Sequence, residues 1–449
     1  MDDLTQKNLD RLEAALKRGG AADYEIFASE TATLAIASKE GEVEILERSR
    51  CRAVSLRVLS PDGRPGFAYS TDLEPGSLAR LAEEAVAASR ETSADAAHGF
   101  PSPRALPEKP SGLFDAGLAA VPQEEKIERA KALERAALAG DPRLKKVRRA
   151  NYHEGIGHVA IRNSRGVNVS GSSTLVSASV TVMAQQGDDS EMGWDYAFSR
   201  SLDGLDVEAV GHGAARRALG CLGGRSLATR ACPALLDSHV AVQLLDLLSS
   251  SLLAESVQKG KSLFAGKLSR QVFSPLLTVI DDGLLPGGME TAPFDDEGNP
   301  RQRTVLIEQG VLRGFLYDQY TANREGCLST GNAARPSALS PPGAKASNLF
   351  LVPGARPFED LVGQMGEGIV ITEVLGMHTA NPISGDFSVG AAGHLVEGGR
   401  VAYPVKGFAI SGNLLRLLSR VAEVGADIRF WGNVGAPSLL VERLDIAGC

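Results

Sequence analysis

The sequence lacks long hydrophobic runs, closely spaced cysteines and an excess of basic residues. No stretch approaches the roughly 18 continuous apolar residues of a membrane span, so we expect no transmembrane helix. The N-terminus is amphipathic, without the apolar core of a signal peptide, and the five cysteines show no CxxC spacing, which favours reduced thiols in the cytoplasm. The net charge of −8 argues against direct DNA binding, because duplex binding depends on Lys and Arg side chains that neutralise phosphates.

A chain of 449 residues is long enough for two or three domains with a large buried core. Its hydrophobic content of 43% and charged content of 23% are typical of a globular protein. We predict an α+β fold in four parts. These are an N-terminal α+β subdomain (1–100), a Pro- and Ala-rich linker (101–122), a second α+β subdomain (123–224) and a C-terminal domain (225–449).

The two N-terminal subdomains share one plan, a helix followed by an antiparallel meander and a second helix. Turn residues such as Pro61-Asp62-Gly63 separate the expected strands of the first unit. The repeated plan predicts two related units. The expected helices are 5–18, 75–90, 123–139 and 206–222, and the expected strands of the second unit are 144–152, 157–163, 166–171 and 174–184.

The C-terminal domain is predicted to be a curved, mostly antiparallel sheet with one long buried helix. Gly and Pro interrupt its strand-like segments, which fits curvature and long loops at 320–349 and 377–393. The helix begins after the capping residues Asp237 and Ser238 and carries apolar residues at three- and four-residue steps. We expect it to end near Lys259, with the last turn LLAESVQKGKS.

This last turn and the segment GMHTANPISGDFSVGAAGHLVEGGRVAYPVKGFAISGN at 376–413 resemble the TldD/PmbA family, once called modulators of DNA gyrase. The resemblance covers nearly the whole chain, and the second segment is similar to the signature of the PmbA/TldE branch. In the TldD branch the helix carries HExxxH, a zinc protease motif. The matching positions here are Ala254, Glu255 and Lys259, and a cysteine of the TldD branch near the C-terminus is matched by Ala436.

These replacements remove the ligands that zinc needs. A catalytic zinc site takes three protein ligands with N, S or O atoms and leaves one position open. Ala254 and Ala436 cannot ligate, and protonated Lys259 places a positive charge where the cation would sit. Because Glu255 cannot hold zinc alone, the resemblance implies no metal, no cofactor and no catalytic residue in this chain, with zinc only in a TldD-like partner.

A second HExxxH match lies in the N-terminal half, from His153 to His158. On a helix, its two histidines and Glu154 could build a metalloprotease site. The flanking segments read as strands, and Gly155 and Gly157 disfavour a helix and suit a turn. We therefore predict a hairpin loop with exposed histidines and place no metal there.

Ser256 and Lys259 match the SxxK spacing of serine acyl-transferases, in which the lysine amine helps to deprotonate the serine. Those enzymes add an SDN-like and then a KTG-like element. Here the KGF segment at 406–408 precedes the SGN segment at 411–413, and the SxxK match falls at the end of the expected helix. A self-contained hydrolase that uses Ser256 and Lys259, or a metal site in the 153–158 segment, stays an alternative hypothesis.

The loop within the 376–413 segment is rich in residues that favour a turn, with Asp386 expected to cap backbone N–H groups. The family resemblance adds a second interpretation, in which this loop lines a peptide-binding chamber or a subunit contact. The candidate residues are His378, Asn381, Ser384 and Asp386.

The resemblance implies a cytoplasmic, non-catalytic subunit of a two-protein metalloprotease. A TldD-like partner would cleave small or unfolded peptides, as in peptide antibiotic maturation and antitoxin degradation, inside a chamber that both subunits close. Extended peptides could bind there by adding to strand edges. We expect the isolated chain to form homodimers, since a surface that fits a homologous subunit is often self-complementary. The old family name suggests another alternative, a binding protein that modulates DNA gyrase.

Overall fold

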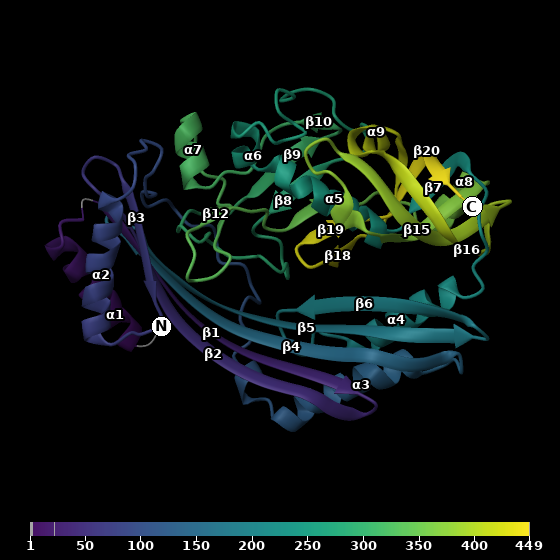
Figure 1. Cartoon of the computed structure of the whole chain (residues 1–449), viewed down its shortest axis with the longest axis horizontal. Helices are drawn as coiled ribbons and strands as arrows, with labels where there is room; N and C mark the ends of the chain where they lie inside the picture. The colour runs from purple at the N-terminus through teal and green to yellow at the C-terminus, as the bar shows by residue number, and fades with distance from the viewer. Residues whose placement is uncertain (1–2, 22, 449) are drawn as a thin grey trace.

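The computed structural model describes residues 3–21 and 23–448. A long, curved sheet forms one layer of the molecule, and a C-terminal domain built on two further sheets lies against one face of it (Figure 1). The fold is α+β, as predicted. No helix in the described part of the chain is long and apolar enough to cross a membrane.

The N-terminal sheet has the order β3-β2-β1-β4-β5-β6, and every neighbouring pair is antiparallel. The two predicted meanders, β1–β3 and β4–β6, therefore join through β1 and β4 into one continuous sheet. The strands are β1 (Asp23–Lys39), β2 (Glu42–Leu59), β3 (Pro65–Ser70), β4 (Leu144–Asn163), β5 (Asn168–Gln186) and β6 (Asp189–Ser199).

Four helices cover the face of this sheet that is turned away from the C-terminal domain (Figure 1). Helices α1 (Asp3–Arg18) and α2 (Pro75–Arg90) bury leucines such as Leu12 and Leu81 at one end of the sheet. At the other end, α3 (Gln123–Leu138) buries Leu133, and α4 (Val207–Cys221) buries smaller side chains such as Val210 and Ala214. All four lie within a few residues of their predicted ranges, because apolar periodicity and end signals such as Pro75 are local properties of the sequence.

The predicted interruption of the fourth and fifth strands is wrong. β4 runs without a break through the 153–158 segment, and β5 runs through residues 172–173, where we expected another boundary. The glycines of β4 remain in the strand conformation because β4 pairs along most of its length with β1 on one side and β5 on the other. This two-sided pairing overrides the local preference for a turn.

The C-terminal domain contains two six-stranded sheets, with orders β10-β9-β8-β13-β19-β18 and β16-β15-β14-β7-β20-β17. β16 also pairs with β20, which curls the second sheet toward a barrel, and the parallel pairings among the described strands are β7–β14 and β13–β19. The predicted curved, mostly antiparallel sheet is confirmed. The strands are β7 (Arg230–Leu236), β8 (Val279–Asp282), β9 (Arg303–Glu308), β10 (Val311–Leu312), β13 (Leu349–Leu351), β14 (Gly368–Leu375), β15 (Asp386–Glu397), β16 (Arg400–Asn413), β17 (Val421–Val424), β18 (Arg429–Trp431), β19 (Val434–Ala436) and β20 (Leu439–Ala447).

Shorter elements fill the segments between these strands. The region 320–349, expected to be a loop, contains most of a helix and a small two-stranded sheet. The second expected loop ends earlier than predicted, because β15 begins at Asp386. The elements are α7 (Gln319–Glu325), β11 (Ala333–Ala334), β12 (Gly343–Ala344), α8 (Phe358–Met365), α9 (Leu414–Ser419), and the 3-10 turns η1 (Leu118–Ala120) and η3 (Met377–Thr379).

The long buried helix is divided. It consists of α5 (Ser238–Ser249), the 3-10 turn η2 (Ser250–Leu252) and the short helix α6 (Ala254–Gln258). Leu253, between η2 and α6, is extended. The backbone on either side of it forms hydrogen bonds with Leu316, and the Ala254 N–H donates to the Leu316 carbonyl at 2.9 Å. A distant segment thus takes the backbone bonds that would have continued the helix, while the apolar periodicity gives no sign of the break.

Candidate functional site

The positions that match HExxxH lie just beyond this break, with Ala254 and Glu255 on α6 and Lys259 at its C-cap. Ala254 is completely buried, whereas Glu255 and Lys259 are about half exposed. The Glu255 carboxylate forms an ion pair with the Lys259 ammonium one turn later. The predicted pairing is therefore present, and an exposed pair of this kind stabilises a helix by only a few tenths of a kcal/mol.

Ala436, the fourth position of the degenerate motif, ends β19 and is also completely buried. It belongs to the same hydrophobic core as Ala254. Of the four positions only Glu255 offers a donor to a metal, and its carboxylate is engaged by Lys259. Within the described ranges no three His, Cys, Asp or Glu side chains are grouped so as to hold a metal ion. These residues do not fit a zinc site.

Ser256 on α6 and Lys259 at its C-cap do not form a serine–lysine pair. α6 runs from Ala254 to Gln258 and Lys259 is its C-cap, so the SxxK match lies at the end of a helix, as expected. The contact between serine and lysine that this chemistry requires is not formed among the described residues. The Lys259 ammonium bonds Glu255, and the described contacts include no hydrogen bond between Lys259 and Ser256.

The HExxxH match from His153 to His158 lies within β4, so the predicted hairpin loop is wrong. Successive side chains of a strand alternate between its faces, which places the two histidines on opposite sides of the sheet. Glu154 is buried and accepts hydrogen bonds from the Lys126 ammonium at 2.8 Å and the Tyr152 hydroxyl at 2.9 Å. The strand thus separates the three groups that a metal would need together.

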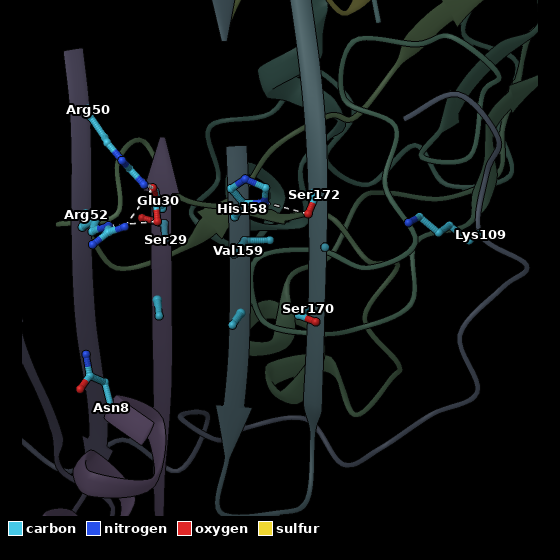
Figure 2. Close-up of a pocket in the computed structure, with 13 residues that line it drawn as sticks. Asn8, Ser29, Glu30, Arg50, Arg52, Lys109, His158, Val159, Ser170 and Ser172 are labelled. Carbon is cyan, nitrogen blue, oxygen red and sulfur yellow. Dashed lines mark hydrogen bonds and ion pairs between the residues drawn. The ribbon is translucent and has the colours of Figure 1, made fainter. Parts of the chain in front are cut away.

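His158 instead lines a polar cavity of about 460 Å³ on the sheet. Figure 2 shows Arg50 and Arg52 of β2 reaching Glu30 of β1, while the His158 ring contacts Ser172 of β5 at 2.8 Å. Arg52, Glu30, His158 and Ser172 are cross-strand neighbours in one row. Each of these four side chains forms a hydrogen bond with a neighbour in the row. The polar groups of the row therefore satisfy one another.

The predicted chamber or interface residues lie on one exposed loop. The Asn381 side-chain oxygen Oδ1 accepts hydrogen bonds from the Ile383 and Ser384 N–H groups, which forms an Asx-type turn. The Asp386 carboxylate accepts from the Asn413 amide at 2.9 Å, and bonds to Asn413 and Ser384 lower its pKa. Asp386 was expected to cap backbone groups and instead ties the loop to β16 through this side chain.

This loop is anchored to the segment that carries the degenerate motif. Buried Ser251 of η2 donates a hydrogen bond to the Pro382 carbonyl at 3.1 Å. His378 is exposed on η3, and the apolar side chains of Leu375 and Ile383 are 60% and 51% exposed nearby in sequence. The structure therefore joins the loop to η2 and leaves polar and apolar groups of the loop exposed.

Sequence analysis missed a second cavity, at the other end of α5. Its volume is about 540 Å³, and side chains from both halves of the chain line it. The lining residues are separated by up to about half the sequence. Of these residues, only Asp237 was identified from the sequence, as the start of a helix. Among the lining residues are Trp194, Arg217, Asp237, His239, Glu373 and Arg429.

Family models match the chain along most of its length. Residues 24–89 match domain 1, 117–222 the central domain and 229–448 the C-terminal domain of the PmbA/TldA metallopeptidases. The chain is 31% identical over 434 residues to the metalloprotease PmbA of Escherichia coli O157:H7, covering 96% of this chain and 94% of that protein. It is 28% identical to a metalloprotease TldD homologue of Haemophilus influenzae, covering 88% and 87%.

Solved structures agree with these matches. A candidate modulator of DNA gyrase from Thermotoga maritima superposes with a TM-score of 0.90 at 31% identity, covering 99% of this chain and all of that one. TldE from Thermococcus kodakarensis superposes with a TM-score of 0.90 at 23% identity, covering 98% of this chain and all of that one, which shows the shared fold. The similarity thus extends over both the N-terminal sheet and the C-terminal domain.

Proposed function

The chain belongs to the PmbA/TldD metallopeptidase family, and we propose that it is the non-catalytic, TldE-like subunit of a two-protein peptidase. The observation that carries this proposal is the set Ala254, Lys259 and Ala436. Two of these side chains are buried methyl groups and the third is a cation paired with Glu255. The zinc and the peptide-cleaving chemistry then belong to a TldD-like partner.

In this proposal the chain supplies a wall of a chamber for small or unfolded peptides in the cytoplasm. The loop with His378, Asn381, Ser384 and Asp386 is a candidate for the chamber lining or the subunit contact, because it is exposed and fixed to η2. The exposed Leu375 and Ile383 side chains support a contact surface, since apolar groups at an interface leave water on association. We propose that the same surface pairs two copies when the chain is isolated.

The test compares the chain alone, a TldD-like subunit alone, and the two mixed. We expect the chain dialysed against zinc to hold no stoichiometric metal and to leave an unfolded polypeptide intact, while the mixture cleaves it faster than the TldD-like subunit alone. Stoichiometric zinc in the chain would overturn the proposal. A mass measurement should give a homodimer for the chain alone and a heterodimer for the mixture, and a strict monomer that ignores the TldD-like subunit would contradict the pairing.

Two variants separate this proposal from a self-contained hydrolase. Ser256→Ala removes the hydroxyl of the SxxK match, and His153→Ala removes one histidine of the second HExxxH match. Both should leave the activity of the mixture unchanged. If the chain alone cleaves peptides and either substitution abolishes that cleavage, the hydrolase hypothesis replaces ours.

A further inference from the structure

The cavity of about 540 Å³ lies between the two halves of the chain. β6 and α4 supply one wall, and the start of α5 with β14 and β18 supplies the other. α5 has 12 residues, so its rise of 1.5 Å per residue puts the cavity roughly 18 Å from the far end of that helix and the degenerate zinc motif beyond it. Cavities of this size at domain boundaries are typical binding sites for small ligands.

Among the described residues, two buried ring nitrogens beside this cavity have no hydrogen-bond partner. With the Gln243 amide nitrogen donating to His239 Nε2 at 3.1 Å, the imidazole hydrogen is assigned to Nδ1. This Nδ1 and the Trp431 Nε1 are both buried without a hydrogen bond. The His239 and Trp431 rings are neighbours, with centroids 4.5 Å apart. Because buried polar atoms are nearly always bonded, an acceptor from a ligand would complete this pair.

Charged groups of both signs are also left open. The Glu373 carboxylate is half-buried and, among the described residues, has no hydrogen bond or ion pair; burial raises its pKa. Arg217 is held loosely, 3.6 Å from Asp237 and 3.5 Å from the Thr372 carbonyl. Asp195, by contrast, is fully engaged by Arg429. Arg216 and Glu359 also line the cavity but are exposed, so Glu373 and Arg217 are the half-buried carboxylate and guanidinium that it offers to a ligand of opposite charges.

Part of the cavity lining is apolar. Met192 and Trp194 of β6 line it and are 41% and 40% exposed, and Phe358 lines the opposite wall. The Trp194 ring stacks on Trp431 at a centroid distance of 5.1 Å, which holds it in place. An apolar side chain lying here would be removed from water by these rings.

We infer that this cavity binds a small zwitterion, a free amino acid or a dipeptide with an apolar side chain. Arg217 and the His239 N–H group receive the carboxylate, Glu373 receives the ammonium, and Trp194 with Met192 receives the apolar side chain. A simple anion would leave Glu373 unpaired, and a simple cation would leave the buried N–H groups unpaired. This inference does not depend on the proposed subunit role.

The experiment measures binding of leucine and leucyl-leucine to the full chain by calorimetry and by the shift in unfolding temperature. N-acetyl-leucine and leucinamide each remove one charge and serve as matched ligands. We expect the zwitterions to bind at millimolar concentration or better and each blocked ligand to bind at least about tenfold more weakly. No binding of either zwitterion, or equal binding of N-acetyl-leucine, would overturn the inference.

Substitutions test whether Glu373 binds the ammonium group of the ligand. Glu373→Gln should weaken leucine binding by about tenfold while leaving the weak binding of N-acetyl-leucine unchanged, because only the ammonium contact is lost. Glu397→Gln, on an exposed end of β15, is the control and should bind like the wild type. The unfolding temperature without ligand shows whether Glu373→Gln is folded. Unchanged leucine binding by a folded Glu373→Gln chain would contradict the assignment.

Discussion

At the residue scale, His239 is a neutral imidazole kept at the start of α5. Burial, together with the guanidinium groups of Arg217 and Arg429, lowers the pKa of His239 to about 4. The unfolded chain takes up a proton at this side chain below about pH 6.5, whereas the native chain does not until about pH 4. Folding stability from this group is therefore lost as the pH falls through that window.

His239→Gln removes this titration. Between pH 7 and pH 5 the wild type should lose about 1–2 kcal/mol more of its free energy of unfolding than the variant, as measured by urea denaturation at both values. His212→Gln, at an exposed position of α4, is the matched control and should follow the wild type. Parallel pH dependence of the wild type and His239→Gln would show that the imidazole is not held neutral.

The residues of the degenerate motif were accessible to sequence reasoning because they follow one another in the chain. Ala254, Glu255 and Lys259 lie where the spacing predicted, and the expected ion pair forms. The cavity around His239 was not accessible, because Arg217 and Glu373 reach it from strands and helices that only the tertiary structure brings together. A local pattern identifies a site within one turn of helix and fails for a site built from several elements.

At the scale of elements, the same close contact occurs once in each N-terminal unit. A Cβ atom at Gly66 of β3 would lie 2.2 Å from the Ala85 carbonyl oxygen of α2. A Cβ atom at Gly193 of β6 would lie 2.1 Å from the Ala214 carbonyl oxygen of α4. In both units, therefore, the third strand uses a glycine to let the following helix pack directly on its backbone.

Gly66→Ala and Gly193→Ala should each lower the free energy of unfolding by about 2–3 kcal/mol, because the added methyl group forces strand and helix apart. Gly155→Ala is the control within the same sheet, since nothing lies within 4 Å of its added Cβ. That variant should keep or slightly raise the stability. Equal stability of all three variants in urea denaturation would show that the close packing is not needed.

The four helices on the N-terminal sheet were predictable and the full strands were not. Helix 75–90 was predicted with its observed bounds because Pro75 and the apolar spacing are local. The break between α5 and α6 depends on Leu316, which is far away in sequence. The continuity of β4 depends on β1, which is also distant in sequence, and on β5, which directly follows β4. Non-local backbone pairing decides both features, so residue patterns alone predict them wrongly.

At the scale of the whole molecule, buried charges tie the N-terminal sheet to the C-terminal domain. Glu25 of β1 is completely buried and forms ion pairs with Arg335, which is 1% exposed, and with Arg57 at 2.6 Å. Arg57 also bonds Glu297 at 2.8 Å. Acidic and basic side chains alternate along this network, so each charge has a neighbour of opposite charge. Removal of one partner would leave a buried charge that water cannot stabilise.

Arg335→Met should therefore lower the free energy of unfolding by about 3 kcal/mol, at the lower end for a broken buried pair because Glu25 keeps Arg57. Arg313→Met is the matched control, since the Arg313–Glu308 pair is about half exposed and should cost less than about 1 kcal/mol. Urea denaturation of both variants measures the difference. If the sheet and the C-terminal domain are one cooperative unit, Arg335→Met shifts the midpoint of a single transition, whereas two separated transitions would show that this network is what couples them.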